Sequence, residues 1–151
     1  MDGNDETGGW KHELLTEGPW AGWNIYDSDP FETHAGPYYN RTDEDGVSVS
    51  AFRAEPKHMN GGGFMHGGAI MTFADYCLFV IAREALQGSH SVTATFNGEF
   101  VGSVPPGALV EGRGEVVKAG RSMIFVRGLI TTGDQPVMSF SAVLKKTGPR
   151  S

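Results

Sequence analysis

The sequence predicts an α+β fold in which a curved antiparallel sheet of about six strands wraps around one long apolar helix. Residues 69–86 are apolar on nearly every helical face, which is typical of a helix that protein surrounds on most sides. Residues 47–53 and 91–101 alternate apolar and polar side chains, as half-buried strands do. The turns between the later strand-like runs are short, and short connections indicate antiparallel neighbours. A single helix buries so many faces only if the sheet curls around it.

The domain organisation predicted from the sequence is simple. We interpret residues 1–30 as an N-terminal leader, residues 31–147 as the folded domain and residues 148–151 as a C-terminal tail. The leader begins with Gly, Asp, Glu and Thr, so we expect a loose segment in which one or both of Trp10 and Trp20 dock on the domain. No internal repeat or linker divides the rest, and 151 residues is the length of one domain.

The strands follow from the pattern of side chains on either side of the helix. Residues 31–41 are predicted as a strand that Pro37 confines to an edge of the sheet. Residues 42–46 form a turn by composition and lead into the strand 47–53. Four strand-like runs follow the helix, separated by turns rich in Gly, Pro and Asp: residues 91–101, 108–118, 121–131 and 137–146.

Charge and cysteine content exclude several classes of protein. The formal net charge is −6, with twelve acidic and four basic side chains in residues 1–60 and six and eight in residues 61–151. This balance argues against nucleic-acid binding but leaves room for a local pocket that takes an anionic small molecule. The single cysteine, Cys77, excludes an internal disulfide and a zinc cluster, and we expect it to pack in the core. Without a signal-peptide pattern or a run long enough to span a membrane, we expect a cytoplasmic protein that does not enter the membrane.

The stretch NGGGFMHGG at residues 60–68 is a glycine-rich turn that runs directly into the helix. Free N–H groups at a helix N-terminus carry partial positive charge, and without Cβ atoms at Gly67 and Gly68 a ligand oxygen can approach them. The first half of the helix contains one charge, Asp75. A carboxylate in apolar surroundings must be paired, hydrogen-bonded or beside water. These features predict oxyanion chemistry at the start of the helix.

The run from Asn60 to Asp75 resembles a known family. Asn60 stands six residues before a His-Gly-Gly triplet that begins at His66, and Asp75 stands nine residues after that histidine, as in the hotdog-fold acyl-CoA thioesterases of the phenylacetate-pathway (PaaI-like) group. The likeness spans about residues 31–146 and includes the hairpin at residues 118–121. It implies a hotdog fold and hydrolysis of the thioester between an acyl group and coenzyme A, by a homodimer paired into a homotetramer. Coenzyme A would be part of the substrate, so no separate cofactor is implied.

The resemblance also implies roles for particular residues. Gly67 would supply its backbone N–H to the thioester oxygen, and Asp75 would be either the general base or the nucleophile. Asn60 and His66 would shape this site, and Thr93 occupies the place of an assisting hydroxyl residue on the next strand. Residues that would contact the substrate are Gly68 and, as partners of the coenzyme A phosphates, Lys118, Gly120, Arg121 and Ser122. Arg121 is the preferred phosphate contact, although each of these charges could equally be a solvated strand end.

Helical geometry adds a prediction that does not depend on the family. A separation of nine residues rotates a side chain by roughly 180° and translates it about 13 to 14 Å along the helix. His66 and Asp75 of one chain therefore point in opposite directions, and one helix cannot bring Asp75 onto an oxygen held at its own N-terminus. Two antiparallel helices from two chains can do so. We therefore expect two equivalent active sites across a twofold dimer interface.

Several alternatives stay open at this stage. The same fold could be a non-catalytic module that binds acyl-CoA as a sensor, or a hydratase or dehydratase, although the His and carboxylate pattern of the latter is not evident. Asp75 could also be satisfied structurally by a neighbouring turn. Burial should raise the pKa of Asp75 and nearby donors should lower it, which leaves the net direction open. The spacing of His58, His66 and Asp75 matches no usual ligand set, so we expect no metal.

Overall fold

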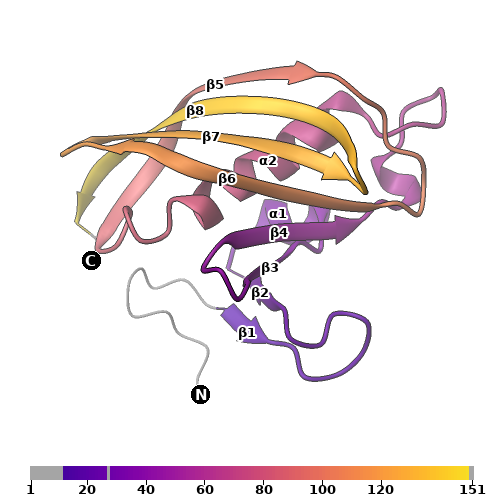
Figure 1. Cartoon of the computed structure of the whole chain (residues 1–151), viewed down its shortest axis with the longest axis horizontal. Coiled ribbons are helices and arrows are strands. Elements are labelled where there is room, and N and C mark those ends of the chain that lie inside the picture. Colours follow the sequence, from indigo (N-terminus) through magenta and orange to yellow (C-terminus); the bar gives the residue numbers. More distant parts are fainter. Residues whose placement is uncertain (1–11, 27, 150–151) are drawn as a thin grey trace.

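The computed structural model describes residues 12–26 and 28–149. Within these ranges, eight strands form one antiparallel sheet in the order β1-β2-β3-β4-β6-β7-β8-β5 (Figure 1). The strands are β1 (His12–Leu14), β2 (Asn24–Tyr26), β3 (Tyr39–Thr42), β4 (Ser48–Arg53), β5 (Ser89–Phe100), β6 (Leu109–Ala119), β7 (Met123–Thr132) and β8 (Gln135–Pro149). The helices are α1 (Pro30–Ala35), the short 3-10 helix η1 (Pro56–His58) and α2 (Gly67–Ile81). The predicted fold class is confirmed, because the sheet curls around one long helix.

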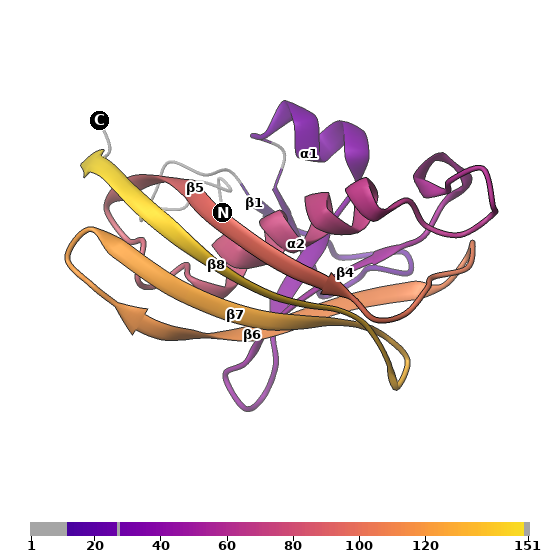
Figure 2. The same ribbon diagram turned by 90° about the horizontal axis from the view of Figure 1, so that it is seen from above.

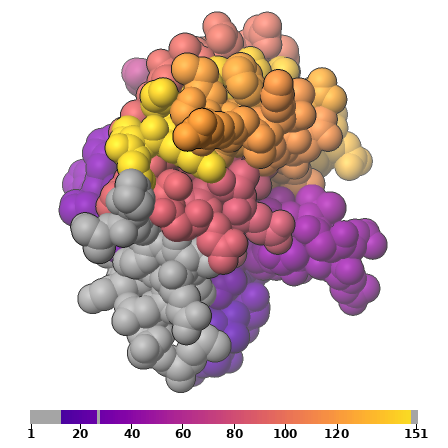
Figure 3. All heavy atoms as spheres, turned by 90° about the vertical axis from the view of Figure 1, so that its left-hand side faces the viewer, coloured from indigo at the N-terminus to yellow at the C-terminus, as the bar shows by residue number. Residues whose placement is uncertain are grey.

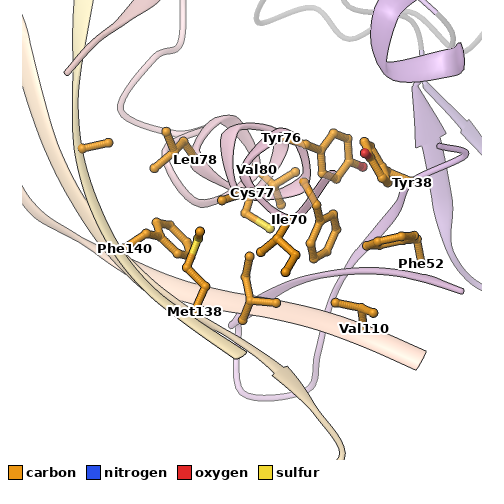
Figure 4. Close-up of a cluster of buried hydrophobic side chains, with 14 of the residues drawn as sticks. Tyr38, Phe52, Ile70, Tyr76, Cys77, Leu78, Val80, Val110, Met138 and Phe140 are labelled. Carbon is orange, nitrogen blue, oxygen red and sulfur yellow. The ribbon is translucent and has the colours of Figure 1, made fainter. Parts of the chain in front are cut away.

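Helix α2 lies in the hollow of the curved sheet (Figure 2). It begins at Gly67, at the glycines where the sequence predicted its N-terminus, and ends at Ile81, before the expected end of the apolar run at Leu86. Its side chains meet those of β4, β6 and β8 in a single core (Figure 4). The buried residues of the helix are Ile70, Phe73, Ala74, Tyr76, Cys77, Leu78 and Val80. No helix in the described part of the chain is long and apolar enough to cross a membrane.

Two glycines of β6 let α2 approach the sheet closely. A Cβ atom at Gly112 would collide with Sγ of Cys77, and one at Gly114 would lie 2.7 Å from Cδ1 of Ile81. Glycine in the middle of a strand is expected where another element comes this near. Cys77 is fully buried in this contact, and burial raises the pKa of its thiol. The prediction that Cys77 packs in the core is therefore confirmed.

The N-terminal region differs from the expected loose leader. Strand β1 pairs with β2 and β2 pairs with β3, so both join the sheet next to the strands of the domain. Trp20 docks on the domain as expected, because its ring stacks on Tyr39 with centroids 3.9 Å apart. Trp10 lies outside the described residues. The expectation of a loose segment is therefore wrong for residues 12–26, whereas the division into leader, domain and tail stays a prediction.

The expected strand at residues 31–41 is also wrong in its first half, which forms helix α1. Asp29 is the N-cap, since its carboxylate accepts a hydrogen bond from the backbone N–H of Glu32 at 2.9 Å. Pro30 occupies the first helical position, where a proline loses no hydrogen bond. Only Tyr39–Thr42 pair as a strand. The local capping chemistry thus determines the structure here.

Polar contacts tie α1 to η1, and tie β3 to α2 and the segment after it. Lys57 Nζ donates hydrogen bonds to the backbone oxygens of His34 at 2.9 Å and Gly36 at 2.6 Å. The Nε2 atom of His58 lies 2.6 Å from the backbone oxygen of Ala35. A second set of bonds joins the buried Asn40 of β3 to the helix. Asn40 donates to the Tyr76 hydroxyl at 2.8 Å, and Arg83 donates to Asn40 Oδ1 at 2.8 Å and to the Tyr26 hydroxyl.

Candidate active site

The backbone N–H groups at the N-terminus of α2 differ in whether they already donate a hydrogen bond. His66 is the N-cap, and its Nδ1 accepts a hydrogen bond from the N–H of Gly68 at 2.8 Å. The N–H groups of Ala69 and Ile70 donate to the backbone oxygen of His66 at 2.9 and 3.1 Å. Among the described residues, the N–H of Gly67 has no hydrogen-bond acceptor. This group is available to an oxygen atom of a ligand.

Asn60 organises the glycine-rich turn that precedes the helix. Its side-chain oxygen accepts hydrogen bonds from the N–H of Gly62 at 2.9 Å and of Phe64 at 3.2 Å. Gly63 has a φ of 89°, a backbone conformation that side chains with a Cβ rarely adopt. Asn60 and His66 therefore both hold the loop and the first turn of the helix. This placement fits the expectation that they shape the site and gives neither of them a contact with Asp75.

Asp75 is paired with Thr93. The Thr93 hydroxyl donates a hydrogen bond to Asp75 Oδ1 at 2.6 Å. Thr93 pairs with Leu144 of β8 and Thr95 with Val143, so one residue of β5 is extra at this β-bulge. Before the bulge the odd-numbered residues of β5 face inward, and after it the even-numbered residues do. The bulge therefore lets Thr93 face Asp75 and Phe96 face the core from the same strand.

The environment of Asp75 raises its pKa, which resolves the direction that the sequence left open. Burial is the largest cause, because removing water disfavours the charged carboxylate. The hydrogen bond from Thr93 acts in the opposite direction and lowers the pKa, and the nearby charge of Asp29 raises it again. A carboxylate with a raised pKa is a stronger base than an ordinary aspartate, as proton abstraction requires.

Asp75 lies between two hollows in the surface. The larger, of about 560 Å³, lies between β5, α2 and the N-terminal segment, and the second, of about 390 Å³, follows the exposed face of α2 under α1. Residues lining the larger hollow are Tyr26, Ser28, Asp29, Glu32, Asp75, Tyr76, Phe79, Ser91, Val92 and Thr93. Residues lining the second are Asp29, Phe31, Glu32, Gly68, Met71, Thr72 and Asp75. Asp29, Glu32 and Asp75 line both hollows and therefore lie where the two hollows meet.

The sequence did not predict Glu32 or Asp29 as residues of this junction. Burial, followed by the charges of Asp29 and Asp75, raises the pKa of Glu32 from 4.5 to about 8. Among residues 12–26 and 28–149, no Lys or Arg lines either hollow. The Asp29-Pro30 pair, an N-cap followed by proline, was a signal that could have predicted α1. Glu32 comes near Asp75 because α1 packs on α2, and no local sequence pattern predicts this packing.

The Gly67 N–H and Asp75 occupy different parts of one helix. Eight residues separate them, which is about 12 Å along the helix axis. A Cβ atom at Gly67 would lie 3.2 Å from Cζ of Phe100, so the Phe100 ring covers the start of the helix while Thr93 meets its middle. Gly68 lines the second hollow together with Asp75. Completion of the site by a second subunit stays a prediction.

The expected coenzyme A contacts lie on the hairpin between β6 and β7. Lys118, Arg121 and Ser122 are exposed, and the N–H of Gly120 donates to the backbone oxygen of Met123 at 2.8 Å. Figure 3 faces this end of the molecule, with the hairpin in orange above the segment that follows α2. None of these four residues lines either hollow. The structure thus keeps them apart from Asp75 and Gly67 of the same chain.

Both histidines near the loop use ring nitrogens to bind backbone groups, His66 through Nδ1 alone and His58 through both nitrogens. His58 Nδ1 accepts from the N–H of Glu55 at 2.9 Å, and its other nitrogen lies at the backbone oxygen of Ala35. Within residues 12–26 and 28–149, no three His, Cys, Asp or Glu side chains are grouped as metal ligands would be. Both histidines hold backbone in the observed structure.

Comparisons with known proteins relate the sequence and the fold of this chain to other proteins. Residues 62–139 match the model of the thioesterase superfamily. A candidate esterase of Pseudomonas aeruginosa is 32% identical over 120 residues, which cover 79% of this chain and 90% of that protein. A Streptococcus mutans protein solved with acetyl CoA is 25% identical, with a TM-score of 0.66 over 74% of this chain and 90% of that one. The Escherichia coli PaaI protein has the same fold, with a TM-score of 0.70 at 18% identity over 82% and 88% of the two chains.

Replacing Glu32 with Gln should stabilise the protein increasingly as the pH rises. In the folded state the pKa of Glu32 is about 8 against an ordinary 4.5, so between these values the unfolded chain ionises Glu32 and the folded chain does not. Wild-type stability therefore falls with rising pH through this window, and Glu32→Gln removes the loss. Urea unfolding of both proteins at about pH 5 and about pH 8 measures the effect.

The exposed Glu84→Gln is the matched control and should show no such trend. An equal difference between wild type and Glu32→Gln at the two pH values would contradict the assignment of a raised pKa to Glu32.

Proposed function

Because the chain belongs to the thioesterase superfamily and is a thioester hydrolase, we propose that it hydrolyses acyl-CoA at a site shared between two subunits. Gly67 of one subunit binds the thioester oxygen, and Asp75 of the other acts as general base or nucleophile. The substrates are acyl- or aryl-acyl-CoA, and the products are the free acid and coenzyme A. The coenzyme A bound to similar folds supports this choice of thioester, as in the Streptococcus mutans protein with acetyl CoA.

The observation that carries this proposal is the N–H of Gly67, which donates to no acceptor in residues 12–26 and 28–149. His66 engages the other early N–H groups of α2, directly or through its backbone oxygen, and leaves Gly67 to a ligand. A donor fixed in advance at the positive end of a helix stabilises the negative charge that develops on a carbonyl oxygen under attack. Removing one such donor from a hydrolase typically lowers kcat by about 100-fold to 1000-fold.

The edge strand β5 supports the pairing of two subunits. It lies at one end of the sheet, twelve residues long, and it exposes Val92 and Phe100 by 53% and 52%. A long apolar edge strand favours pairing with another chain. If β5 pairs with its own copy about a twofold axis between Phe96 and Asn97, Thr93 comes to lie opposite Phe100 of the partner subunit. Since Thr93 holds Asp75 and Phe100 covers Gly67, this register brings Asp75 towards the partner's Gly67.

The reaction follows from these groups in one of two ways. As a general base, Asp75 accepts a proton from water while the water oxygen attacks the thioester carbon, and the oxyanion forms on the Gly67 N–H. As a nucleophile, Asp75 attacks the carbon and forms an anhydride that water then cleaves. In both routes the carbon–sulfur bond breaks, the thiol departs and the acid is released. Thr93 orients the Asp75 carboxylate through its hydrogen bond.

The remaining expected residues act around this centre. Asn60 and His66 hold the loop that aims the Gly67 N–H, and Gly68 lies against the substrate. The hairpin residues Lys118, Gly120, Arg121 and Ser122 are proposed to bind the phosphates of coenzyme A. Their hairpin lies near the first part of β5, because Lys146 pairs with Ser91 and its N–H donates to the backbone oxygen of Ser122 at 2.8 Å. The subunits form a homodimer, and pairing of dimers gives the homotetramer.

Asp75→Asn should lower kcat for acyl-CoA hydrolysis by at least about 100-fold, because the variant can neither accept a proton nor form an anhydride. Thiol release from a panel that includes acetyl-CoA and phenylacetyl-CoA measures turnover, and calorimetry with coenzyme A measures binding, which should change little. Asp134→Asn, in the turn between β7 and β8, is the control. Tight binding of acyl-CoA without turnover by the wild type would favour the sensor, and an unchanged rate in Asp75→Asn would exclude this residue as catalyst.

Thr93→Val should move the acidic limb of the kcat/KM profile to higher pH by about one unit, since a hydrogen bond to a charged group is lost. The Thr93 bond lowers the pKa of Asp75, so its removal raises that pKa further and less carboxylate remains at acidic pH. Thr95→Val, an exposed neighbour beyond the bulge, should leave the limb in place. A limb that stays where it is in Thr93→Val would show that this bond does not act on the reacting group.

A further inference from the structure

The carboxyl group of Glu32 lines the same two hollows as Asp75, and this position indicates a role in the reaction. We propose that Glu32 is a second catalytic residue, which gives a proton to the departing sulfur while Asp75 serves the attacking oxygen. This inference rests on the thioesterase reaction proposed above and adds a group to it. Glu32 would contact the sulfur atom of the thioester directly.

The position of Glu32 relative to the hollows is the main argument. The larger hollow and the hollow along α2 meet at Asp29, Glu32 and Asp75. A thioester has two arms, the acyl group and the thiol chain, which extend in opposite directions from the reacting bond. If the arms fill the two hollows, the carbon–sulfur bond lies at the junction. Asp75 and Glu32 then both face that bond.

The three carboxyl groups at the junction are not equivalent. Asp75 accepts a hydrogen bond from Thr93, and Asp29 accepts one from the backbone N–H of Glu32 as the cap of α1. Among the described residues, the carboxyl of Glu32 has no hydrogen-bond partner. Glu32 is therefore the carboxyl that remains available to a substrate atom.

Helix α1 holds Glu32 in a fixed place. Lys57 and His58 bind the backbone oxygens at the end of α1, and Asp29 caps its beginning. A catalytic group must be held by surrounding contacts to act efficiently. Six residues of helix tied at both ends meet that requirement better than a free loop.

The surroundings of Glu32 favour its protonated form at neutral pH. Burial and the charges of Asp29 and Asp75 raise the pKa of Glu32 to about 8. The pKa of Asp75 is raised as well, but Thr93 stabilises its ionised form. Two carboxyls whose environments separate their protonation states commonly serve as acid and base. Among the described residues, the titratable or charged groups near Glu32 come from several elements. They are Asp29, which caps its helix, Asp75, Tyr76 and Cys77 on α2, Tyr26 on β2, Tyr38 before β3, and Lys57 beyond the end of α1.

The proton balance closes without a further reactant. Water loses one proton to the Asp75 carboxylate, and its oxygen bonds to the thioester carbon. The carbon–sulfur bond then breaks, its electron pair goes to sulfur, and the Glu32 carboxylic acid protonates that sulfur. The proton on Asp75 returns to the Glu32 carboxylate before the next cycle. The net change is one water and one thioester converted to one acid and one thiol.

The dependence on the leaving group tests this role. An alkyl thiol such as that of coenzyme A has a pKa near that of cysteine, about 8.5, and gains from a proton as it leaves. The thiol of 4-nitrothiophenol is much more acidic and leaves as the anion. We would measure kcat/KM for wild type, Glu32→Gln, Glu32→Asp and the control Glu84→Gln with both thioesters of the acyl group that the wild type hydrolyses best.

We expect Glu32→Gln to lower kcat/KM for the CoA ester by about 100-fold, the lower range for general acid catalysis, and for the aryl thioester by less than about threefold. Glu32→Asp, which keeps an acid, should recover part of the loss with the CoA ester. The ratio of the two substrates is independent of the fraction of folded enzyme. An equal loss with both thioesters, or no loss with either, would overturn the role of Glu32 and leave the thioesterase function standing. A wild type that hydrolyses no acyl-CoA would overturn the function itself.

Discussion

The structure depends on one constraint, which is that a helix buried on most sides must still present the first turn of its backbone to a ligand. The sheet and the N-terminal segment cover α2 on most sides, whereas the Gly67 N–H at the glycine turn has no acceptor within the described part of the chain. His66 accepts hydrogen bonds from the next three N–H groups of α2, so a ligand meets the partial positive charge of the helix at the N–H of Gly67. Asn60 shapes the turn that makes this possible.

The chemistry then depends on the surroundings of two carboxyl groups, Asp75 in the middle of α2 and Glu32 on α1. Apolar surroundings raise the pKa of Asp75, and the bulge in β5 brings the Thr93 hydroxyl to its carboxylate. Helix α1 adds Glu32, for which burial and neighbouring negative charge favour the neutral form. One fold thus gives two similar side chains different surroundings within the same surface hollows, with a hydrogen bond from Thr93 at Asp75 and none to the carboxyl of Glu32 among the described residues.

The sequence predicted the parts of the fold that a regular period encodes. The apolar run of α2 and the alternating strands β4 to β8 are such parts, and Asn60, Gly67 and Asp75 were identified by their spacing. The prediction of a strand over residues 31–41 did not take into account the capping signal of Asp29 and Pro30, which starts α1 instead. The contact of Glu32 with the hollows and the bulge at Thr93 depend on packing between distant segments. No local pattern reports such packing, and the roles of the site residues stay predictions.

The most direct test of the cross-subunit site is complementation between two inactive variants. Asp75→Asn removes the carboxylate, and Gly67→Val places a side chain against the Phe100 ring and blocks the N–H. In a mixed dimer, one site receives the intact Gly67 from the first variant and the intact Asp75 from the second. After subunit exchange in equal amounts, we expect about a quarter of the wild-type activity, from one working site in half of the dimers. No activity in mixtures shown to contain mixed dimers would contradict a site shared between subunits.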